Sequence, residues 1–434
     1  MARKMKDSGV EWIGKIPEEW KIVKVKDAFI RKNIKANIKN PIILTLARSG
    51  VKIRDITNNE GQLAADYSNY NPVEIDDLLL NPMDLISGDN CNISRVKGVI
   101  SPAYINLRYR KGTNPELYNL YFKNLYWGNV LFAHGKGVSY ENRWTLSYET
   151  LSQMKIPYPP SYEQDKIAEF IVDKLNKIED IKSTIIQEIQ TIEDYKKSLI
   201  TEAVTKGLDK NVEMKDSGVE WIGKIPKHWK VIRIKNTALL KARIGWQGLR
   251  SDEFLDDERL PYLVTGTDFK EGFVDWKNCV RISEQRFEMD KNIQIKENDL
   301  LITKDGTIGK LAIAKNCPDK ASLNSGVFVI RNQGPYKYSD KYMYYLLQSE
   351  QFLLWFELND AGNSTIRHLY QKDFYNFSFT YPEEQEQEKI ALYLDKKTKS
   401  IDEAIENKQK QLEVLEEYKK SLIYEYVTGK KEVL

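Results

Sequence analysis

Two stretches of the chain carry apolar residues at the spacing of long amphipathic helices. In the first stretch an apolar residue stands at every seventh position, at Ile171, Ile178, Ile185, Ile192 and Leu199. Neither Pro nor Gly interrupts residues 161–206. The second stretch repeats this pattern, with Glu and Lys on its other faces, at Leu394, Ile401, Ile405, Leu412, Leu415 and Leu422, although Lys408 breaks it. A sustained apolar repeat of this kind predicts two helices that pair as a coiled coil.

The length of these helices indicates a spacer. We expect them to span residues 161–207 and 383–428, with a short C-terminal tail at 429–434. A helix of about 40 residues is about 60 Å long, which is more than a globular core requires. The alternative is that each helix only covers the domain beside it, and the length argues against that.

The stretches before the two helices, residues 1–160 and 208–382, show the short patterns of mixed α/β domains. In the first, we predict strands and then a helix that Asn114 and Pro115 open; the strands are Ile42–Leu46, Asp84–Ser87 and Gly98–Tyr109. In the second, a helix from Ser339 through Trp355 follows strands at Asp299–Thr303, Leu311–Ala314 and Gly326–Arg331. The shared order of elements predicts one scaffold used twice.

The chain contains an internal duplication. The segment MKDSGVEWIGKIP occurs at residues 5–17 and again, unchanged, at 214–226, and a Trp follows each copy at the same distance. A second pair of segments closes the halves, because EQDKIAEF from Glu163 matches EQEKIALY from Glu386 and YKKSLI occurs twice. The residues between these segments show little likeness. The repeated opening and closing segments, which we call the frame, therefore enclose two dissimilar domains.

The duplication also predicts a geometry. If a pseudo-twofold axis relates the halves, the two helices run antiparallel and carry the dissimilar domains at opposite ends. The expected fold class is α+β, with two pseudo-twofold-related mixed α/β domains separated by two long helices that form an antiparallel coiled coil.

Composition narrows the partners and the compartment. The chain has 66 Lys and Arg against 63 Asp and Glu, so affinity for nucleic acid has to come from local basic clusters. Cys91, Cys279 and Cys317 are odd in number and far apart, which favours a reducing cytoplasm over a disulfide framework. The N-terminus lacks the apolar core of a signal peptide, and no later run is long enough to cross a membrane. We expect a cytoplasmic protein without a membrane partner.

The segment TKDGTIGK, residues 303–310, is the best candidate for contact with DNA. It lies between two predicted strands and presents Lys304, Thr307 and Lys310 together with backbone amides. This combination suits phosphates and base edges. The alternative is a basic hairpin that faces only solvent.

Four other loops mix hydrogen-bond donors with aromatic or turn-forming residues. Among these residues, Asn can bind adenine and Arg can bind guanine, each through two hydrogen bonds. In the stretch 242–250, a packed Trp246 beside solvated arginines is an equally good interpretation. The candidates are Asn90, Asn92, Arg95 and Lys97; Lys136, Tyr140, Asn142 and Arg143; Arg243, Gln247 and Arg250; and Asn363, Ser364, Thr365, Arg367 and His368.

The sequence lacks the motifs of the enzymes that act on DNA. Its three histidines do not have the spacing of metal ligands. The segment GTIGK, residues 306–310, is not a nucleotide-binding loop, because its upstream Gly is at the wrong distance and Leu311 stands where Ser or Thr would bind magnesium. No Gly-rich fingerprint for a methyl-donor cofactor is present, and Tyr158-Pro159-Pro160 lacks the Asn of the amino-methyltransferase tetrad. We expect no catalytic residues, metal or cofactor in this chain.

The repeated segments resemble those of the specificity subunits of type I restriction-modification systems. The shared features are SGVEWIGKIPxxW, a PPxxEQxxIA helix start and a YKxSLIxxxVT helix end, and both halves carry segments of all three kinds. The likeness covers the whole chain in architecture and is specific only in these segments. In the second copy, Lys227 and His228 replace Glu18 and Glu19, which makes the two frames unequal.

The resemblance implies two target-recognition domains held apart by paired helices, each reading one half of an asymmetric, interrupted DNA site. It also implies the partners: double-stranded DNA, two modification (methyltransferase) subunits on the repeated frame, and restriction (nuclease and translocase) subunits. The methyl donor, ATP and Mg²⁺ would then belong to the partner chains. Two alternatives stay open, namely a coiled-coil scaffold with duplicated protein-binding domains and a self-contained nuclease or methyltransferase.

Overall fold

The computed structural model describes residues 3–55, 67–86, 90–137, 144–243, 249–360 and 367–433, apart from the side chain of residue 360. The chain forms two units. The first comprises Met1–Ile186 with Gln409–Leu434, and the second comprises Gln187–Lys408. Each unit therefore contains one of the dissimilar domains together with parts of both long helices, and each is described by itself below.

The first unit is built on a four-stranded antiparallel sheet in the order β4-β11-β8-β9. These strands are β4 (Phe29–Arg31), β11 (Ile105–Tyr109), β8 (Leu78–Leu80) and β9 (Cys91–Ile93). Four strand pairs surround it: β1 (Met5–Asp7) with β2 (Lys15–Pro17), β3 (Lys21–Lys24) with β12 (Lys155–Tyr158), β5 (Leu44–Ala47) with β6 (Gly50–Ile53), and β7 (Asn71–Val73) with β10 (Gly98–Ile100). The helices are α1 (Val25–Ala28), α2 (Pro115–Trp127), α3 (Val130–Ala133) and α4 (Tyr148–Gln153).

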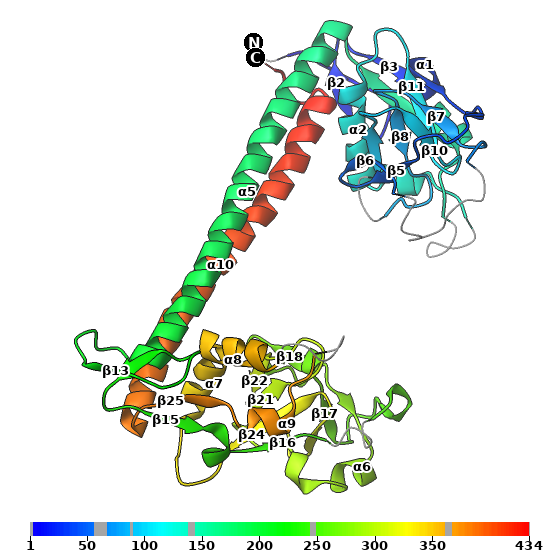
Figure 1. The fold of residues 1–434 in the computed structure, drawn as a ribbon. Coiled ribbons are helices and arrows are strands. Elements are labelled where there is room, and N and C mark those ends of the chain that lie inside the picture. Colours follow the sequence, from blue (N-terminus) through cyan, green and yellow to red (C-terminus); the bar gives the residue numbers. More distant parts are fainter. Residues whose placement is uncertain are drawn as a thin grey trace. The chain divides into compact units, whose positions relative to one another are not determined.

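The helix α2 covers the four-stranded sheet of the first unit (Figure 1). It begins as expected, because the Asn114 side chain accepts a hydrogen bond from Leu117 N at 3.0 Å and Pro115 occupies the first turn. The apolar core that it completes also contains residues from both long helices, namely Ile167, Ala168, Ile171, Ile423 and Val427. The domain and the two helix segments therefore fold as one body.

Two strand predictions for the first half were wrong in detail. Residues 84–86 do not form a strand, and Leu85 and Ile86 form a bend. They follow a turn in which the Asn81 side chain accepts from Met83 N and Pro82 has no amide hydrogen to donate. The stretch 98–109 is not one strand. A turn closed by Tyr104 N donating to Ser101 O divides it into β10 and β11.

The second unit has a six-stranded sheet in the order β16-β24-β21-β22-β19-β18. Its strands are β16 (Ala238–Lys241), β24 (Val327–Asn332), β21 (Leu300–Thr303), β22 (Leu311–Ile313), β19 (Phe273–Val274) and β18 (Phe269–Lys270). The remaining strands are β20 (Val280–Arg281), β17 (Tyr262–Val264) and β23 (Ala321–Leu323) in one sheet, β13 (Met214–Asp216) with β14 (Lys224–Pro226), and β15 (Lys230–Arg233) with β25 (Ser378–Tyr381). The first four strands of the main sheet repeat the connectivity of the first unit.

The helices of the second unit are α6 (Glu284–Glu288), α7 (Asp340–Gln348), α8 (Glu350–Asp360) and α9 (Gln371–Phe374), with 3-10 turns at Ile234–Asn236, Ser251–Glu253, Gly266–Asp268 and Lys291–Ile293. The single helix predicted from Ser339 through Trp355 is interrupted. The Ser349 hydroxyl donates to Leu346 O at 2.6 Å, and this ends α7 before α8 starts. The core again includes helix residues, here Ile200, Ala203, Val204, Ile390 and Leu394.

The long helices are α5 (Ser161–Lys206) and α10 (Glu384–Val427). Within the first unit Lys419 binds Glu179 at 3.0 Å and Lys182 binds Glu416. Within the second unit the Nζ atoms of Lys196 and Lys408 lie 2.6 Å from Asp402 and Glu188, respectively. Residue numbers rise along one helix as they fall along the other, so the contacting segments run antiparallel in each unit (Figure 1).

The repeated opening segments fold identically. Met5 pairs with Pro17 in the β1–β2 hairpin, and Met214 pairs with Pro226 in the β13–β14 hairpin. The indole that follows each hairpin is fully buried and donates to the first Glu of the helix-start segment. Trp20 Nε1 lies 2.9 Å from Glu163 Oε2, and Trp229 Nε1 lies 3.0 Å from Glu386 Oε2. The exact sequence repeat therefore encodes a repeated joint between domain and helix.

Candidate nucleic-acid interface

The loop that connects β21 to β22 is held rigidly by one hydroxyl group. Thr303 Oγ1 donates to Thr307 O at 2.5 Å and accepts from Lys310 N at 2.9 Å. The backbone of Thr303 also pairs with that of Lys310. Thr303 itself is buried, whereas Thr307 and Lys310 are exposed. The loop therefore presents its polar residues from a fixed backbone, as the pattern TKDGTIGK predicts.

A second segment, residues 367–370, is tethered to this loop. Leu369 N donates to Lys304 O at 2.9 Å, and the buried Leu369 side chain anchors the segment in the core. The guanidinium of Arg367 lies 4.9 Å from the centre of the Phe356 ring. The two segments lie some sixty positions apart in the chain, so only the fold brings them together.

Asp305 joins the two segments electrostatically. Its Oδ2 atom lies 2.9 Å from Lys304 Nζ, and its Oδ1 atom lies 2.6 Å from Nδ1 of His368. Partial burial on its own raises the pKa of Asp305. The hydrogen bonds from His368 and Lys304 and the charge of Lys304 outweigh that effect and hold the pKa of Asp305 below its usual value. We call Lys304, Asp305, Arg367 and His368 the charged cluster.

The charged cluster combines an ammonium, a guanidinium and an imidazole group with the Asp305 carboxylate. Lys304 Nζ and His368 Nδ1 both contact this carboxylate, and the guanidinium of Arg367 lies over the Phe356 ring. Partial exposure of Lys304 (21%) and His368 (36%) leaves their polar atoms within reach of a ligand. Guanidinium, ammonium and imidazole groups on a rigid loop are the donors that bind phosphate oxygens and the acceptor edge of guanine.

In the first unit, the amide side chains proposed as base contacts point inward. Asn90 is 8% exposed and its Nδ2 atom donates to Asp84 Oδ2 at 2.9 Å. Asn92 is 9% exposed and donates to Ala47 O at 3.3 Å, so it fastens β9 to the β5–β6 turn. A DNA contact by either residue stays a prediction, and burial weighs against both.

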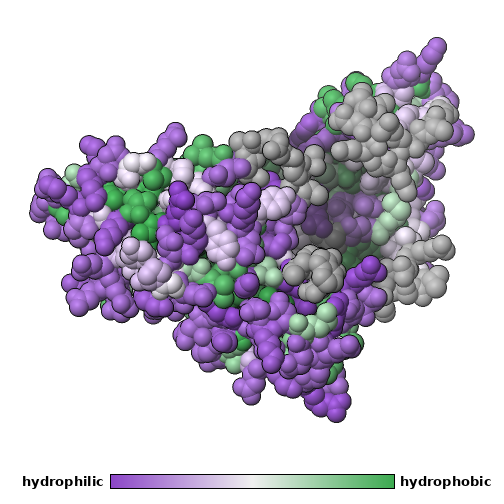
Figure 2. Space-filling model, turned by 60° about the horizontal axis from the view of Figure 1, so that its bottom comes forward, coloured by the Kyte–Doolittle hydropathy of each residue, from purple (hydrophilic) through white to green (hydrophobic). Residues whose placement is uncertain are grey.

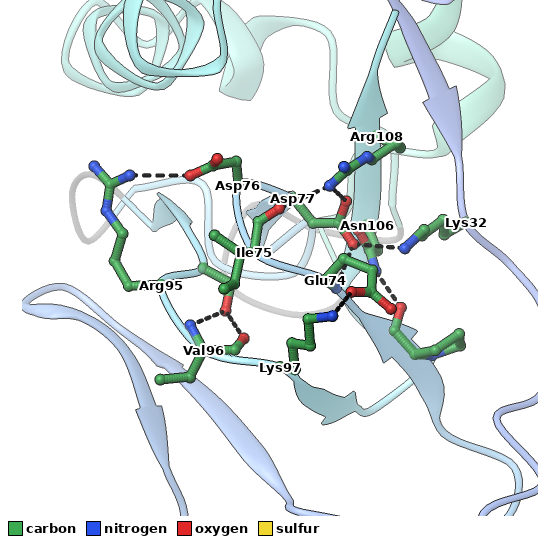
Figure 3. A network of polar contacts seen from close by, with 12 residues as sticks. Lys32, Glu74, Ile75, Asp76, Asp77, Arg95, Val96, Lys97, Asn106 and Arg108 are labelled. Carbon is green, nitrogen blue, oxygen red and sulfur yellow. Dashed lines mark hydrogen bonds and ion pairs between the residues drawn. The ribbon is translucent and has the colours of Figure 1, made fainter.

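Arg95 and Lys97 instead lie at the surface, where they form ion pairs (Figure 3). Arg95 binds Asp76 at 3.0 Å and also binds Glu116, and Lys97 Nζ lies 3.0 Å from Glu74. The side chains of Arg95 and Lys97 are 64% and 69% exposed. Exposed ion pairs are weak, so a phosphate can replace the carboxylate partner at little cost.

A buried carboxylate that was not among the predicted site residues holds together the segments that carry these exposed ion pairs. Asp77 is fully buried and binds Lys32 Nζ at 2.9 Å and Arg108 at 3.0 Å (Figure 3). Its Oδ2 atom also accepts from Glu74 N at 2.8 Å, and Arg108 donates to Ile75 O. The carboxylate therefore ties the turn before β8 to strand β11.

The second unit contains an equivalent buried aspartate that links a turn to a strand. Asp299 binds Arg331 of β24, Oδ1 to Nε at 2.8 Å, and its Oδ2 atom accepts from Lys296 N at 2.7 Å. The residue before each aspartate, Asp76 or Asn298, has a positive φ of 66° or 65°. The sequence marks both aspartates by one pattern, in which an Asp follows Asp or Asn and precedes an apolar strand, at 76–80 and 298–302. The aspartate that ties this turn to a neighbouring strand is a shared structural feature of the two dissimilar domains.

The other candidates are dispersed. Lys136 is exposed and its backbone pairs with Thr145, while Arg250 is exposed and its amide donates to Glu253 at 3.1 Å. Arg243 is only 2% exposed and donates to Leu323 O at 2.9 Å, so the alternative of a solvated arginine does not hold at this position, and a DNA contact by Arg243 stays a prediction. Burial and the nearby Arg286 lower the pKa of Arg243. Outside the described residues lie Tyr140, Asn142, Arg143, Gln247, Asn363, Ser364 and Thr365.

Hydrophilic residues cover most of the described part of the face drawn in Figure 2, with scattered apolar positions. Among the described residues, no group of three or more His, Cys, Asp or Glu has a metal-binding arrangement. None of the described helices is long and apolar enough to cross a membrane. The exposed donors described above are groups that can bind phosphate oxygens and base edges.

Comparison with known proteins agrees with this chemistry. The family model described as the type I restriction modification DNA specificity domain matches residues 226–414. Two Methanocaldococcus jannaschii proteins are each 24% identical over 96% of this chain: the putative type I restriction enzyme MjaX specificity subunit, with 95% of its length covered, and the MjaVIII specificity subunit, with 94%. The EcoBI specificity subunit of Escherichia coli is 23% identical over 82% of this chain and 75% of its own length.

Solved structures share the fold. A chain from work on complex assembly and conformational transition of the type I R-M system aligns with a TM-score of 0.70 at 14% identity, over 95% of this chain and 98% of that one. The HsdS subunit from Thermoanaerobacter tengcongensis aligns with a TM-score of 0.51 at 13% identity, over 98% of this chain and 100% of its own. At these identities the matches establish a mixed α/β fold with long helices.

Proposed function

We propose that this chain, which belongs to the specificity subunits of type I restriction-modification systems, reads an asymmetric bipartite DNA sequence with one mixed α/β domain at each half. The family membership confirms the resemblance expected from the repeated segments. The observation that carries the proposal is that one frame is built twice, down to the buried indole–carboxylate hydrogen bond, around domains whose exposed loops differ.

We infer that α5 and α10 form an antiparallel coiled coil about a pseudo-twofold axis and act as a spacer. The antiparallel ion pairs within each unit support this inference, with Lys182 and Glu416 in the first unit and Lys196 and Asp402 in the second. A fixed spacer would set the number of unread base pairs between the half-sites, because the DNA grooves repeat about every 34 Å.

The chain is proposed as a non-catalytic subunit. Methyl transfer and cleavage would be carried out by modification and restriction subunits, which would also hold the methyl donor, ATP and Mg²⁺. Two modification subunits would fit the two copies of the frame. This division of labour agrees with the specificity-subunit names of the relatives and with the exposed donors of the described loops.

The first test measures DNA binding by the chain assembled with its modification subunits. Affinity should fall steeply as salt is raised from about 50 mM to about 200 mM, because each phosphate contact releases counterions. The coiled-coil scaffold would instead be supported if the complex did not bind DNA at any salt concentration while the chain bound protein partners through its two domains. Activity of the purified single chain with Mg²⁺ or a methyl donor would contradict the non-catalytic assignment.

A further inference from the structure

The orientation of His368 is fixed by Asp305, which was not among the expected DNA contacts. Nδ1 of His368 lies 2.6 Å from Asp305 Oδ1, so this nitrogen carries the hydrogen of the shared bond. Nε2, on the opposite edge of the ring, is therefore the nitrogen directed away from the carboxylate. In the neutral ring Nε2 accepts hydrogen bonds, and in the protonated ring it donates them.

Protonation of His368 would add a donor to a surface that already carries Lys304 and Arg367. Asp305 of the β21–β22 loop contacts the ring directly, Lys304 of the same loop binds the same carboxylate, and the Tyr370 ring lies 5.8 Å from the His368 ring. Asp305 is thus the carboxylate positioned to balance an imidazolium. Phosphate oxygens and the O6 and N7 atoms of guanine are acceptors, so they pair with the protonated ring alone.

We propose that Asp305 is a positioning residue that aims Nε2 of His368 at an acceptor on DNA, and that protonation of His368 strengthens DNA binding by the second domain. The proposal rests on the proposed function, since it supposes that the charged cluster faces DNA. It adds a residue and a pH response to that function. A phosphate and a guanine edge share the acceptor chemistry, and the experiment below distinguishes them.

The experiment uses the full chain assembled with its modification subunits and a duplex that carries the methylated motif, with a scrambled duplex for comparison. Fluorescence anisotropy at constant ionic strength gives the affinity at about pH 6 and about pH 8, on either side of the range in which histidine changes charge. The wild type should bind about fivefold more tightly at the lower pH, as expected from one net hydrogen bond.

Three variants test the assignment. His368→Gln keeps a polar side chain that does not titrate, and it should abolish the fivefold difference. His228→Gln removes the histidine that faces Glu386 at 3.0 Å, outside the charged cluster, and should retain the difference. Asp305→Asn removes a negative charge, so simple electrostatics predicts tighter binding. A positioning role predicts instead a smaller pH response and a weaker preference for the motif over the scrambled duplex.

The results for His368→Gln distinguish a phosphate contact from a base contact and from no contact. Loss of affinity for both duplexes in His368→Gln identifies a phosphate contact, and loss of preference for the motif identifies a base contact; both support the proposal. An unchanged pH response in His368→Gln overturns it and leaves the proposed function standing, because the complex still binds its motif. A wild-type complex without DNA affinity overturns both. Thermal unfolding of each variant checks that the fold is intact.

Discussion

Gly429 follows α10 at the place where the C-terminal segment meets the opening segment of the chain. Its φ is +71°, and a Cβ atom there would lie 2.7 Å from Pro17 Cγ and 2.9 Å from Trp20 Cη2. Lys430, the next residue, donates from Nζ to Ile13 O at 2.8 Å. The contact therefore joins residues that are more than four hundred positions apart, and Gly429→Ala tests it directly.

The magnitude follows from two effects. Alanine in the left-handed region costs about 1–2 kcal/mol, of which about 0.4–1 kcal/mol is returned because Ala restricts the unfolded chain. Overpacking against Pro17 and Trp20 adds about 1–3 kcal/mol, since neither ring is a flexible side-chain end. We expect Gly429→Ala to lower the free energy of unfolding of the first unit by about 3 kcal/mol.

Gly9→Ala is the matched control. Gly9 lies in the opening segment with a φ of +64°, and a Cβ atom there would meet nothing within 4 Å. It should cost only about 1 kcal/mol, the backbone strain without the overlap. Urea unfolding followed by circular dichroism gives the free energies, and hydrogen exchange localises the loss to residues 5–20 and the end of α10. Equal destabilisation by the two variants would refute the close contact of Gly429 with Pro17 and Trp20.

Three other outcomes follow from the described contacts. Asp77→Ala leaves Lys32 and Arg108 without their buried partner and should cost about 3 kcal/mol in urea unfolding; a loss no larger than that of Asp173→Ala, an exposed ion pair on α5, would contradict this. Because the pKa of Asp305 is lowered by folding, its carboxylate stabilises the protein above the ordinary aspartate pKa and loses this effect below about pH 4. The difference in the free energy of unfolding between the wild type and Asp305→Asn should therefore shrink as pH falls from about 6 to about 3. A difference that grows over this range would contradict the lowered pKa of Asp305. Lys304→Ala should weaken DNA binding by about 1–3 kcal/mol if Lys304 contacts a base, as competition binding would measure; unchanged affinity would place Lys304 outside the interface.

Periodicity was sufficient to find the long helices, because a seven-residue stripe without Pro or Gly leaves few alternatives. Ile171, Ile178 and Ile185 are buried as the stripe requires. The order of strands was also recognisable from the duplicated pattern. Short polar turns were harder to predict, and residues 84–86 follow such a turn, in which Pro82 and the Asn81 side chain interrupt the expected strand.

The candidate site was only partly predictable, for a physical reason. The loop at 303–310 is encoded locally, since Thr303, Gly306 and Gly309 set its turn. The contact between Asp305 and His368 depends on how distant segments pack, and no local pattern contains it. The inward orientation of Asn90, Asn92 and Arg243 is likewise a property of the packed domain, because the same residue types serve equally well as turn formers, core hydrogen-bond donors or base readers.

The claim that each domain reads its own half-site is tested most directly by the DNA methylation pattern in a host that lacks other methylases and expresses this chain with its modification subunits. Single-molecule sequencing should show one bipartite motif. When residues 208–382 are exchanged for the corresponding domain of a relative, one half of the motif should change and the other half should stay as it was. A continuous motif, or an exchange that alters both halves at once, would contradict the claim that each domain reads its own half-site.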